Sequence, residues 1–269
     1  MNKQIEKAYE ERPRNTVYQI TVSAIILALL IWSGSAVDVS KTGLSGVQIA
    51  GNILSGIFHP DRKLLFNLTL QGVPYLLLET VCIAFLGTIV GAFLAIPLSF
   101  LSASNLMPAP IAYVTRLVIM AVRTIPAFVY GLMFIRVSGP GAFTGLLTMS
   151  VCSIGMVSKM YIEAIEDLDT RILESLDACG CNTFQKIRYG ILPQLIPNFA
   201  STVIYRFDIN LRDATVLGLV GAGGIGAPLI FAMNAYRWNE AGAILVGLIL
   251  LVLIVEYIST RIRVKLARG

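Results

Sequence analysis

The stretch Glu174–Pro197, ESLDACGCNTFQKIRYGILPQLIP, is a polar interruption in a chain that otherwise consists of long apolar runs. It opens on an acidic residue, has a glycine at Gly180, and ends on Leu192-Pro193 and a further proline. Membrane spans are usually joined by short connections. A long polar segment between two apolar runs therefore predicts a structured surface on which another protein docks.

The remainder of the chain has the composition of a membrane protein. Of its 269 residues, 56% are hydrophobic and 14% are charged, whereas about a quarter of the residues of a soluble protein are charged. The apolar runs are long enough to cross a bilayer at about 1.5 Å per helical residue. The sequence predicts an all-α, polytopic transmembrane bundle, with spans at residues 16–37, 71–102, 110–136, 139–160, 195–220 and 239–260.

Lysine and arginine gather at both ends of the chain and mark the side of the membrane on which those ends lie. They are Lys3, Lys7, Arg12 and Arg14 near one terminus and Arg261, Arg263, Lys265 and Arg268 near the other. Basic flanks are typical of the cytoplasmic side, so both termini are predicted to be cytoplasmic. Residues 1–15 then form a cytoplasmic segment, and residues 16–269 form a transmembrane domain that contains a cytoplasmic loop at 161–194.

The composition argues against several classes of function. The net charge of +5 comes from basic residues that flank spans and not from one stripe, so nucleic acid is not expected as a partner. The single His59 and four cysteines lack metal-ligand spacing, so no metal site is predicted. No Ser/His pair or other polar catalytic set accompanies them, so the chain is not expected to be an enzyme.

The polar insert predicts two helices that meet at a corner. Residues 169–178 form the first helix, and Gly180 permits a tight turn or a left-handed backbone. Asn182-Thr183 caps a second helix, and Pro193 begins the return into the membrane. From spacing alone, an ordinary loop that happens to be helical remains an alternative.

The order of residues in the insert resembles the "EAA…G…LP" loop of the inner-membrane permeases of ATP-binding-cassette importers. Glu174, Ala178, Gly180 and Leu192-Pro193 carry the resemblance, while Ser175-Leu176 stands where the pattern has two alanines. In that family the loop is a coupling helix that sits in a groove of a cytosolic ATPase. The resemblance implies contact residues at Glu174, Ser175, Asp177, Ala178, Gly180, Asn182, Thr183, Phe184, Leu192 and Pro193, with Phe184 as an apolar anchor.

A second resemblance lies further along the chain. The segment GAGGIG at 221–226 resembles one found near the last span of many such importers, including methionine and betaine types. As G-x-G-x-x-G it lacks the α/β setting of a dinucleotide site, so a bend or close helix packing is expected instead. Gly87-x-x-x-Gly91 likewise predicts close helix approach. YRF at 205–207, followed by Asn210, Arg212 and this glycine segment, is similar to the phosphonate-type permease subunit over 118–261.

This resemblance implies a machine of several subunits. The permease would be a homodimer in a prokaryotic plasma (inner) membrane, with two cytosolic ATP-binding subunits that hold ATP and Mg. An extracytoplasmic binding protein would deliver phosphonate, phosphite or a phosphate-like anion. This chain would itself bind no cofactor, because hydrolysis belongs to its partner. A permease for an amino acid or betaine is the nearest alternative, and a stand-alone secondary transporter is the more distant one.

The fifth predicted span contains the charges Arg206, Asp208, Arg212 and Asp213. Charges at this depth must pair or face water. One hypothesis is mutual neutralisation, of Asp208 by Arg212 at i, i+4 and of Arg206 by Asp213 on a shared face. A second is that the arginines line the translocation path and attract an oxyanion, and a third is a role in gating. Asn210 is expected to mark a break in this helix beside a cavity.

The third predicted span contains Arg123 shortly before Pro126. A proline within a span removes a backbone hydrogen bond and bends the helix. Arg123 is interpreted as a residue that extends its charged group toward the membrane surface, as the partner of Glu79 in the second span, or as a residue of the translocation path.

Overall fold

The computed structural model describes residues 16–36 and 44–267. Helices and short connections fill these ranges, and no strand occurs within them, so the predicted all-α class is confirmed. The internal contacts divide the chain into two units, residues 1–51 and 52–269. The predicted cytoplasmic segment 1–15 lies outside the described residues.

The first unit contains α2 (Thr16–Ala36), which coincides with the first predicted span. Its stretch Val17–Ser35 is long and apolar enough to cross a membrane. A helix that is apolar on all sides suits a lipid environment. Helix α3 (Leu44–Phe58) begins in this unit, and its last residues from Asn52 belong to the second unit.

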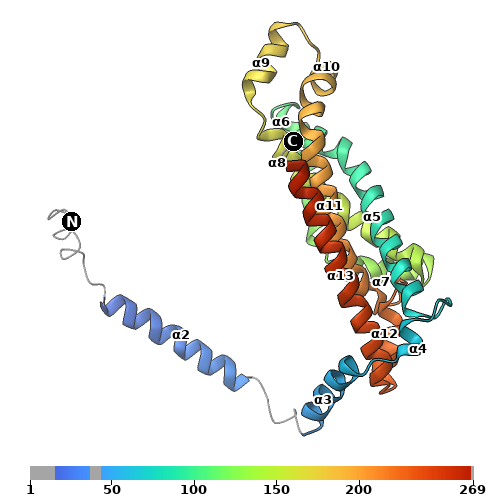
Figure 1. The fold of residues 1–269 in the computed structure, drawn as a ribbon. Coiled ribbons are helices and arrows are strands. Elements are labelled where there is room, and N and C mark those ends of the chain that lie inside the picture. Colours follow the sequence, from blue (N-terminus) through green and yellow to red (C-terminus); the bar gives the residue numbers. More distant parts are fainter. Residues whose placement is uncertain (1–15, 37–43, 268–269) are drawn as a thin grey trace, which may run out of the picture. The chain divides into compact units, whose positions relative to one another are not determined.

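The second unit is a bundle in which the long helices α5, α8, α11 and α13 pack together (Figure 1). Helices α9 and α10 lie at one end of this bundle, hereafter the α10 end, and α4 and α12 lie at the other, the α12 end. The elements are α4 (Arg62–Leu65), α5 (Val73–Ser102), α6 (Ala109–Thr124), α7 (Ala127–Ser138), α8 (Ala142–Glu166), α9 (Thr170–Ala178), α10 (Thr183–Gln185), the π-helix η2 (Lys186–Ile191), α11 (Leu192–Gly218), α12 (Gly226–Asn234) and α13 (Trp238–Ala267).

Within the described ranges, four helices are long and apolar enough to span a membrane: α2, α5, α8 and α13. A fifth span is possible if α6 and α7 count as one, although they bend by 85°. The predicted span 110–136 corresponds to this pair, and the bend expected at its proline is confirmed. Ile125 adopts an extended backbone, as residues before proline do, and Pro126 starts α7 anew. Helix α11 matches the fifth predicted span in position, but its charges set it apart from the apolar spans.

Glycines bring α5 and α8 into close contact, as Gly87-x-x-x-Gly91 predicts. A Cβ added at Gly87 would meet the Cβ of Met149, and one added at Gly91 would meet the Cβ of Ser153. Only residues without side chains permit this separation of the helices. The backbones of α5 and α8 therefore form the inner pair around which the other helices pack.

The glycine segment 221–226 turns the chain between α11 and α12. Gly221, Gly223 and Gly224 all have positive φ, which favours glycine. The amide of Ile225 donates to the hydroxyl of Thr80 on α5 at 2.9 Å. The expected bend and close packing are confirmed, whereas α12 itself falls within a stretch that the sequence analysis treats as a connection.

Candidate functional site

The polar insert folds as two helices that meet at a glycine corner. Asp169 caps α9 by accepting a hydrogen bond from the amide of Arg171 at 3.0 Å. Helix α9 ends at Ala178, and Gly180 takes a φ of +73°, where a Cβ would strain the backbone. The predicted first helix and the left-handed glycine are both confirmed.

Asn182 caps the second helix, as predicted, and does so reciprocally with Gln185. The Asn182 side chain accepts from the Gln185 amide at 2.9 Å, and the Gln185 side chain accepts from the Asn182 amide at 2.9 Å. The Asn-x-x-Gln spacing is the sequence signal by which this capping box can be found. Helix α10 then continues through η2 into α11, so the corner is joined to the membrane bundle by uninterrupted helical backbone.

Two contacts that the sequence analysis did not foresee brace the corner. Lys186 on η2 forms an ion pair with Asp177 on α9. Leu176 on α9 packs against Gly190 on η2, where a Cβ would meet the leucine side chain. Residues 169–191, hereafter the corner, therefore have a defined shape, although most of those whose side chains are described are exposed.

The residues predicted to contact an ATPase fall into two groups. Leu192 and Pro193 lie apart from the others, at the start of α11, where Leu192 is half-buried against the bundle. Phe184 has 68% of its surface exposed, so an apolar ring is available on the corner. The corner brings together and exposes Glu174, Ser175, Asp177, Ala178, Gly180, Asn182, Thr183 and Phe184.

A group of polar contacts that the sequence does not predict lies where the chain enters the corner. Glu166, the last residue of α8, forms an ion pair with Arg116 of α6. The same carboxylate accepts from the amide of Ser104 at 2.7 Å, and Arg116 Nε donates to the carbonyl of Ser102 at 2.9 Å. These contacts tie the chain entering the corner to both α6 and the end of α5.

Asn210 joins three helices inside the bundle and does not break its own. Its side-chain amide donates to Thr88 Oγ1 on α5 at 2.8 Å and to Ser153 Oγ on α8 at 2.7 Å. Asn210 is fully buried, and α11 is continuous from Leu192 to Gly218. The expected helix break is therefore wrong, because the side-chain nitrogen of Asn210 donates to two neighbouring helices while α11 stays continuous.

Arg206 lies buried on α11 one turn before Asn210. Its Nε donates to Ser153 Oγ at 3.3 Å, and its Nη1 lies 3.0 Å from Met156 Sδ. Within the described part of the chain it forms no ion pair, so the predicted neutralisation by Asp213 is not made by direct contact. A guanidinium held mainly by a hydroxyl and a thioether retains most of its capacity to bind an anion.

Arg212 lies between two carboxylates. Its Nη2 is 2.9 Å from Asp208 Oδ2, which confirms the predicted i, i+4 pair. The same nitrogen is 3.4 Å from Glu256 Oε2 on α13, a partner that the sequence analysis did not name. The Asp208 side chain is 7% exposed, whereas those of Arg212 and Glu256 are 48% and 54% exposed.

Arg123 lies in the last turn of α6, before the bend to α7. Its stem packs on Gly155 of α8, in the turn whose Ser153 and Met156 contact Arg206. Among the residues described, no ion pair joins Arg123 to Glu79, so that expected pairing is wrong. The structure thus brings Arg123 and Arg206 to the same turn of α8.

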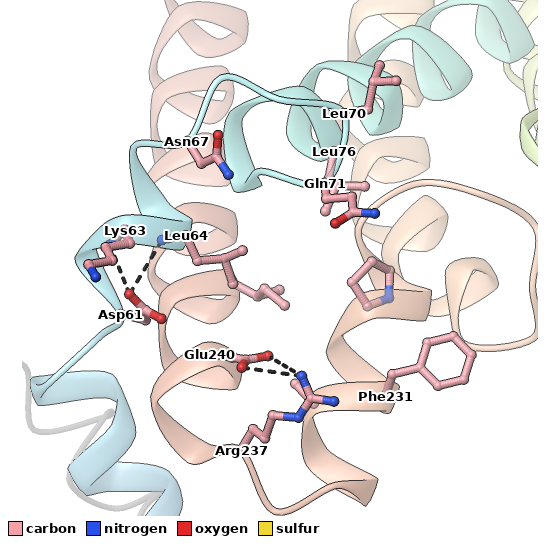
Figure 2. Close-up of a pocket in the computed structure, with 13 residues that line it drawn as sticks. Asp61, Lys63, Leu64, Asn67, Leu70, Gln71, Leu76, Phe231, Arg237 and Glu240 are labelled. Atoms are coloured by element: carbon pink, nitrogen blue, oxygen red, sulfur yellow. Dashed lines mark hydrogen bonds and ion pairs between the residues drawn. The ribbon is translucent and has the colours of Figure 1, made fainter.

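A cavity of about 650 Å³ opens at the α12 end between α4, α12 and α13 (Figure 2). Arg237 and Glu240 form an ion pair of 3.2 Å on one wall, and Asp61 caps α4 on another. Leu64, Leu76 and Phe231 supply apolar surface. In the ranges 16–36 and 44–267, no three His, Cys, Asp or Glu side chains lie close enough together to hold a metal ion.

Comparisons with known proteins agree with these features. The family described as "Binding-protein-dependent transport system inner membrane component" matches residues 87–269. The putative phosphite transport system permease protein HtxC of Stutzerimonas stutzeri is 32% identical over 98% of this chain and 94% of its own length. The phosphate-import permease protein PhnE of Mycolicibacterium smegmatis is 35% identical over 70% of this chain and 36% of its own length.

A solved structure supports the fold. A chain of the MetNI methionine ABC transporter, in an inward-facing conformation, superimposes with a TM-score of 0.62 at 20% identity. The match covers 71% of this chain and 94% of that one. The predicted permease-like bundle is confirmed, and the chain belongs to the family of binding-protein-dependent transport system inner membrane components.

Proposed function

We propose that this chain is the permease subunit of an ATP-driven importer that carries a phosphorus oxyanion, such as phosphonate, phosphite or phosphate, into a prokaryotic cell. The observation that carries the proposal is the corner, residues 169–191. It is exposed, braced by the Asp177–Lys186 pair, and continuous with α11. A docking surface needs both exposure and a fixed shape, since ordering a loose loop on binding would oppose association.

The distribution of charge supports a cytoplasmic position for the corner. The last turns of α13 carry Arg261, Arg263 and Lys265, and this end of α13 lies at the α10 end (Figure 1). Basic residues favour the cytoplasmic side of a span. The corner would then face two cytosolic ATP-binding subunits, which hold the ATP and Mg, while an extracytoplasmic binding protein docks on the opposite side.

A homodimer would cover charges that a single copy leaves half-exposed. Arg212 and Glu256 lie in long helices of the bundle and yet expose about half of their side chains. Charges within a membrane face a protein partner or a water-filled path and not lipid. A second copy packed across α11 and α13 would enclose both residues around such a path.

The continuous helix from Thr183 to Gly218 can transmit movement between the corner and the arginines of α11. ATP binding by the partner would close the dimer and move the corner, and η2 with α11 would transmit that movement to Arg206 and Arg212. Hydrolysis would reset the path toward the cytoplasm. The chain contributes a path and a lever, and the partner supplies the chemistry.

The proposed cargo follows from the arginines and from the relatives. Guanidinium groups bind oxyanions with paired, directional hydrogen bonds. Arg123 and Arg206 reach the same turn of α8, and Arg212 lies on α11 six residues after Arg206. Asp208, Asn210 and Asp213 complete the proposed path by balancing or positioning these cations. The names of relatives from two organisms refer to phosphite and phosphate.

The test is to reconstitute this chain with its ATPase and binding protein and to measure ATP hydrolysis. Phosphonate, phosphite, phosphate and glycine betaine would be added separately. We expect at least one phosphorus oxyanion to stimulate hydrolysis and betaine to have no effect. Stimulation by betaine alone would contradict the cargo. Uptake that needs no ATPase partner and collapses with an ionophore would contradict the ATP-driven mechanism.

A further inference from the structure

Glu256 is a charged residue inside α13 that the proposed mechanism leaves without a role. It lies within Trp238–Leu266, one of the apolar spans, and contacts Arg212 of α11. A carboxylate in such a helix is expensive to insert, so its position needs a partner or water. The contact with Arg212 places it beside the cation that is most exposed among the arginines of α11.

We propose that Glu256 is an internal counter-anion for Arg212, which occupies the guanidinium between transport events and gives way to the substrate oxyanion. This inference rests on the proposed function and deepens it by assigning a specificity-determining residue. The carboxylate of Glu256 resembles the cargo in charge and in hydrogen-bonding oxygens. It can therefore hold the same donors that an incoming oxyanion needs.

The two carboxylates around Arg212 are unequal, and the difference identifies the exchangeable one. Asp208 is buried, lies on the same helix and is 2.9 Å from Nη2. Glu256 is half-exposed, lies on another helix and is 3.4 Å from the same nitrogen. A short, buried, intrahelical contact is retained, whereas a longer and solvent-accessible contact between helices is the one that anion binding can replace.

Arg212 has donors to spare for the cargo. A guanidinium carries five N–H groups, and both carboxylates approach the single atom Nη2. No described residue accepts a hydrogen bond from Nε or Nη1 of Arg212. An oxyanion can thus approach the free edge of the guanidinium before Glu256 leaves, which is how an exchange proceeds without an unpaired charge.

Glu256 also has a place to which it can move. A hollow of about 700 Å³ on α13 is lined by Glu256 itself together with Tyr257, Thr260 and Arg261. Arg261 donates to the hydroxyl of Tyr257 at 2.9 Å, and its guanidinium is a second cation within this hollow. Leu253 and Val264 also line the hollow, so the displaced carboxylate would meet the polar groups of Tyr257, Thr260 and Arg261 beside apolar surface.

The exchange has a physical benefit for transport. A path must bind its cargo well enough to admit it and weakly enough to release it. An arginine with Asp208 alone would retain an anion more strongly than an arginine that also attracts Glu256. Competition by Glu256 lowers the affinity and restores a neutralised arginine after each release.

The experiment compares Glu256→Gln with Glu240→Gln, a matched carboxylate of the same helix that pairs with Arg237 at the α12 end. Equilibrium binding of radiolabelled phosphate would be measured on the purified assembly without binding protein. We expect Glu256→Gln to tighten binding about tenfold, a coupling typical of linked sites, and Glu240→Gln to match wild type. In the double variant that combines Glu256→Gln with Arg212→Gln, the gain in phosphate affinity should be absent.

Equal binding by wild type and Glu256→Gln, with both assembled, would overturn the inference, and so would a gain that survives Arg212→Gln. If Glu256→Gln fails to assemble, Glu256→Asp keeps the charge and shortens its reach, and an unchanged Kd for that variant would likewise overturn it. Uptake by the complete wild-type system is measured in parallel. Absence of any oxyanion uptake there would contradict the proposed function instead.

Discussion

The corner at residues 169–191 and the polar layer of α11 differ in how their polar residues are held. In the corner, Asn182 is satisfied by Gln185, three residues away. In α11, the side-chain nitrogen of Asn210 donates to Thr88 and Ser153, on two other helices. The comparison teaches that the corner is shaped mostly by local contacts and can be altered alone, whereas a change in the polar layer disturbs the whole bundle.

The largest expected effect comes from overfilling the contact between α5 and α8. Gly91→Val would drive a side chain into the Cβ of Ser153 and toward the carbonyl of Ser150, which lies 2.6 Å from an ideal Cβ. We expect a loss of at least about 3 kcal/mol in unfolding free energy, or no assembled protein. Gly51→Val is the matched control, because nothing lies within 4 Å of that helical glycine. Equal thermal stability of the two variants would contradict this packing.

The next effect separates docking from stability. Phe184→Ala removes an exposed side chain from the corner and should leave thermal unfolding unchanged. Binding of the ATPase should weaken by about 2 kcal/mol, as for an aromatic anchor in an interface. Tyr113→Ala on α6 is the control, because that aromatic side chain is also 68% exposed. A pull-down in which both variants retain the ATPase equally would remove Phe184 from the contact.

Asn210→Ala tests the opposite case, a residue that the structure places in the interior. Two buried hydrogen bonds are lost, so the unfolding free energy should fall by about 1 to 2 kcal/mol. Asn198→Ala, at an exposed position of the same helix, should change it little. Thermal unfolding in detergent provides the measurement. If Asn210→Ala were as stable as its control but inactive in uptake, Asn210 would act on the path without stabilising the bundle.

The smallest expected effect is that of Gly180→Ala in the corner. The added Cβ meets no other atom, but the φ of +73° disfavours an L-residue by about 1 kcal/mol. We expect a modest loss of ATPase binding and unchanged stability of the membrane bundle. Gly46→Ala, which meets nothing and has no positive φ, is the control. An alanine variant with full ATPase affinity would show that the corner tolerates another backbone conformation.

The sequence predicts the corner better than the polar layer of α11, because the contacts of the corner are local and those of the polar layer are distant. The order of Glu174, Gly180 and Asn182 predicts the helices of the corner, because caps and turns depend on near neighbours. The partners of Asn210 lie 57 and 122 residues away, so its role was misjudged as a helix break. Glu256 was visible as a charge in an apolar span, but its partner is 44 residues distant.

The sequence predicts the positions of the long apolar spans, but not the angles between helices or the short helix α12. Long apolar runs predict α2, α5, α8 and α13, because an uncharged apolar helix of this length favours the membrane whatever its distant contacts are. Pro126 predicts a bend, but the angle of 85° depends on how α6 and α7 pack on α8. Short helix α12 has no periodic signal of its own and follows from the glycine turn that precedes it.

The most direct test of the account measures uptake and ATP hydrolysis in the same proteoliposomes, with binding protein and ATPase present. Phe184→Ala should lose both uptake and ATP hydrolysis, because the contact between the corner and the ATPase is weakened. Arg212→Gln and Arg206→Gln should lose uptake while assembly and basal hydrolysis persist. These substitutions alter the translocation path and leave the contact with the ATPase intact. Two results would contradict the account, in which the corner binds the ATPase and the arginines of α11 act in the translocation path. One is unchanged uptake in both arginine variants at equal protein levels, and the other is an equal loss of hydrolysis in all variants.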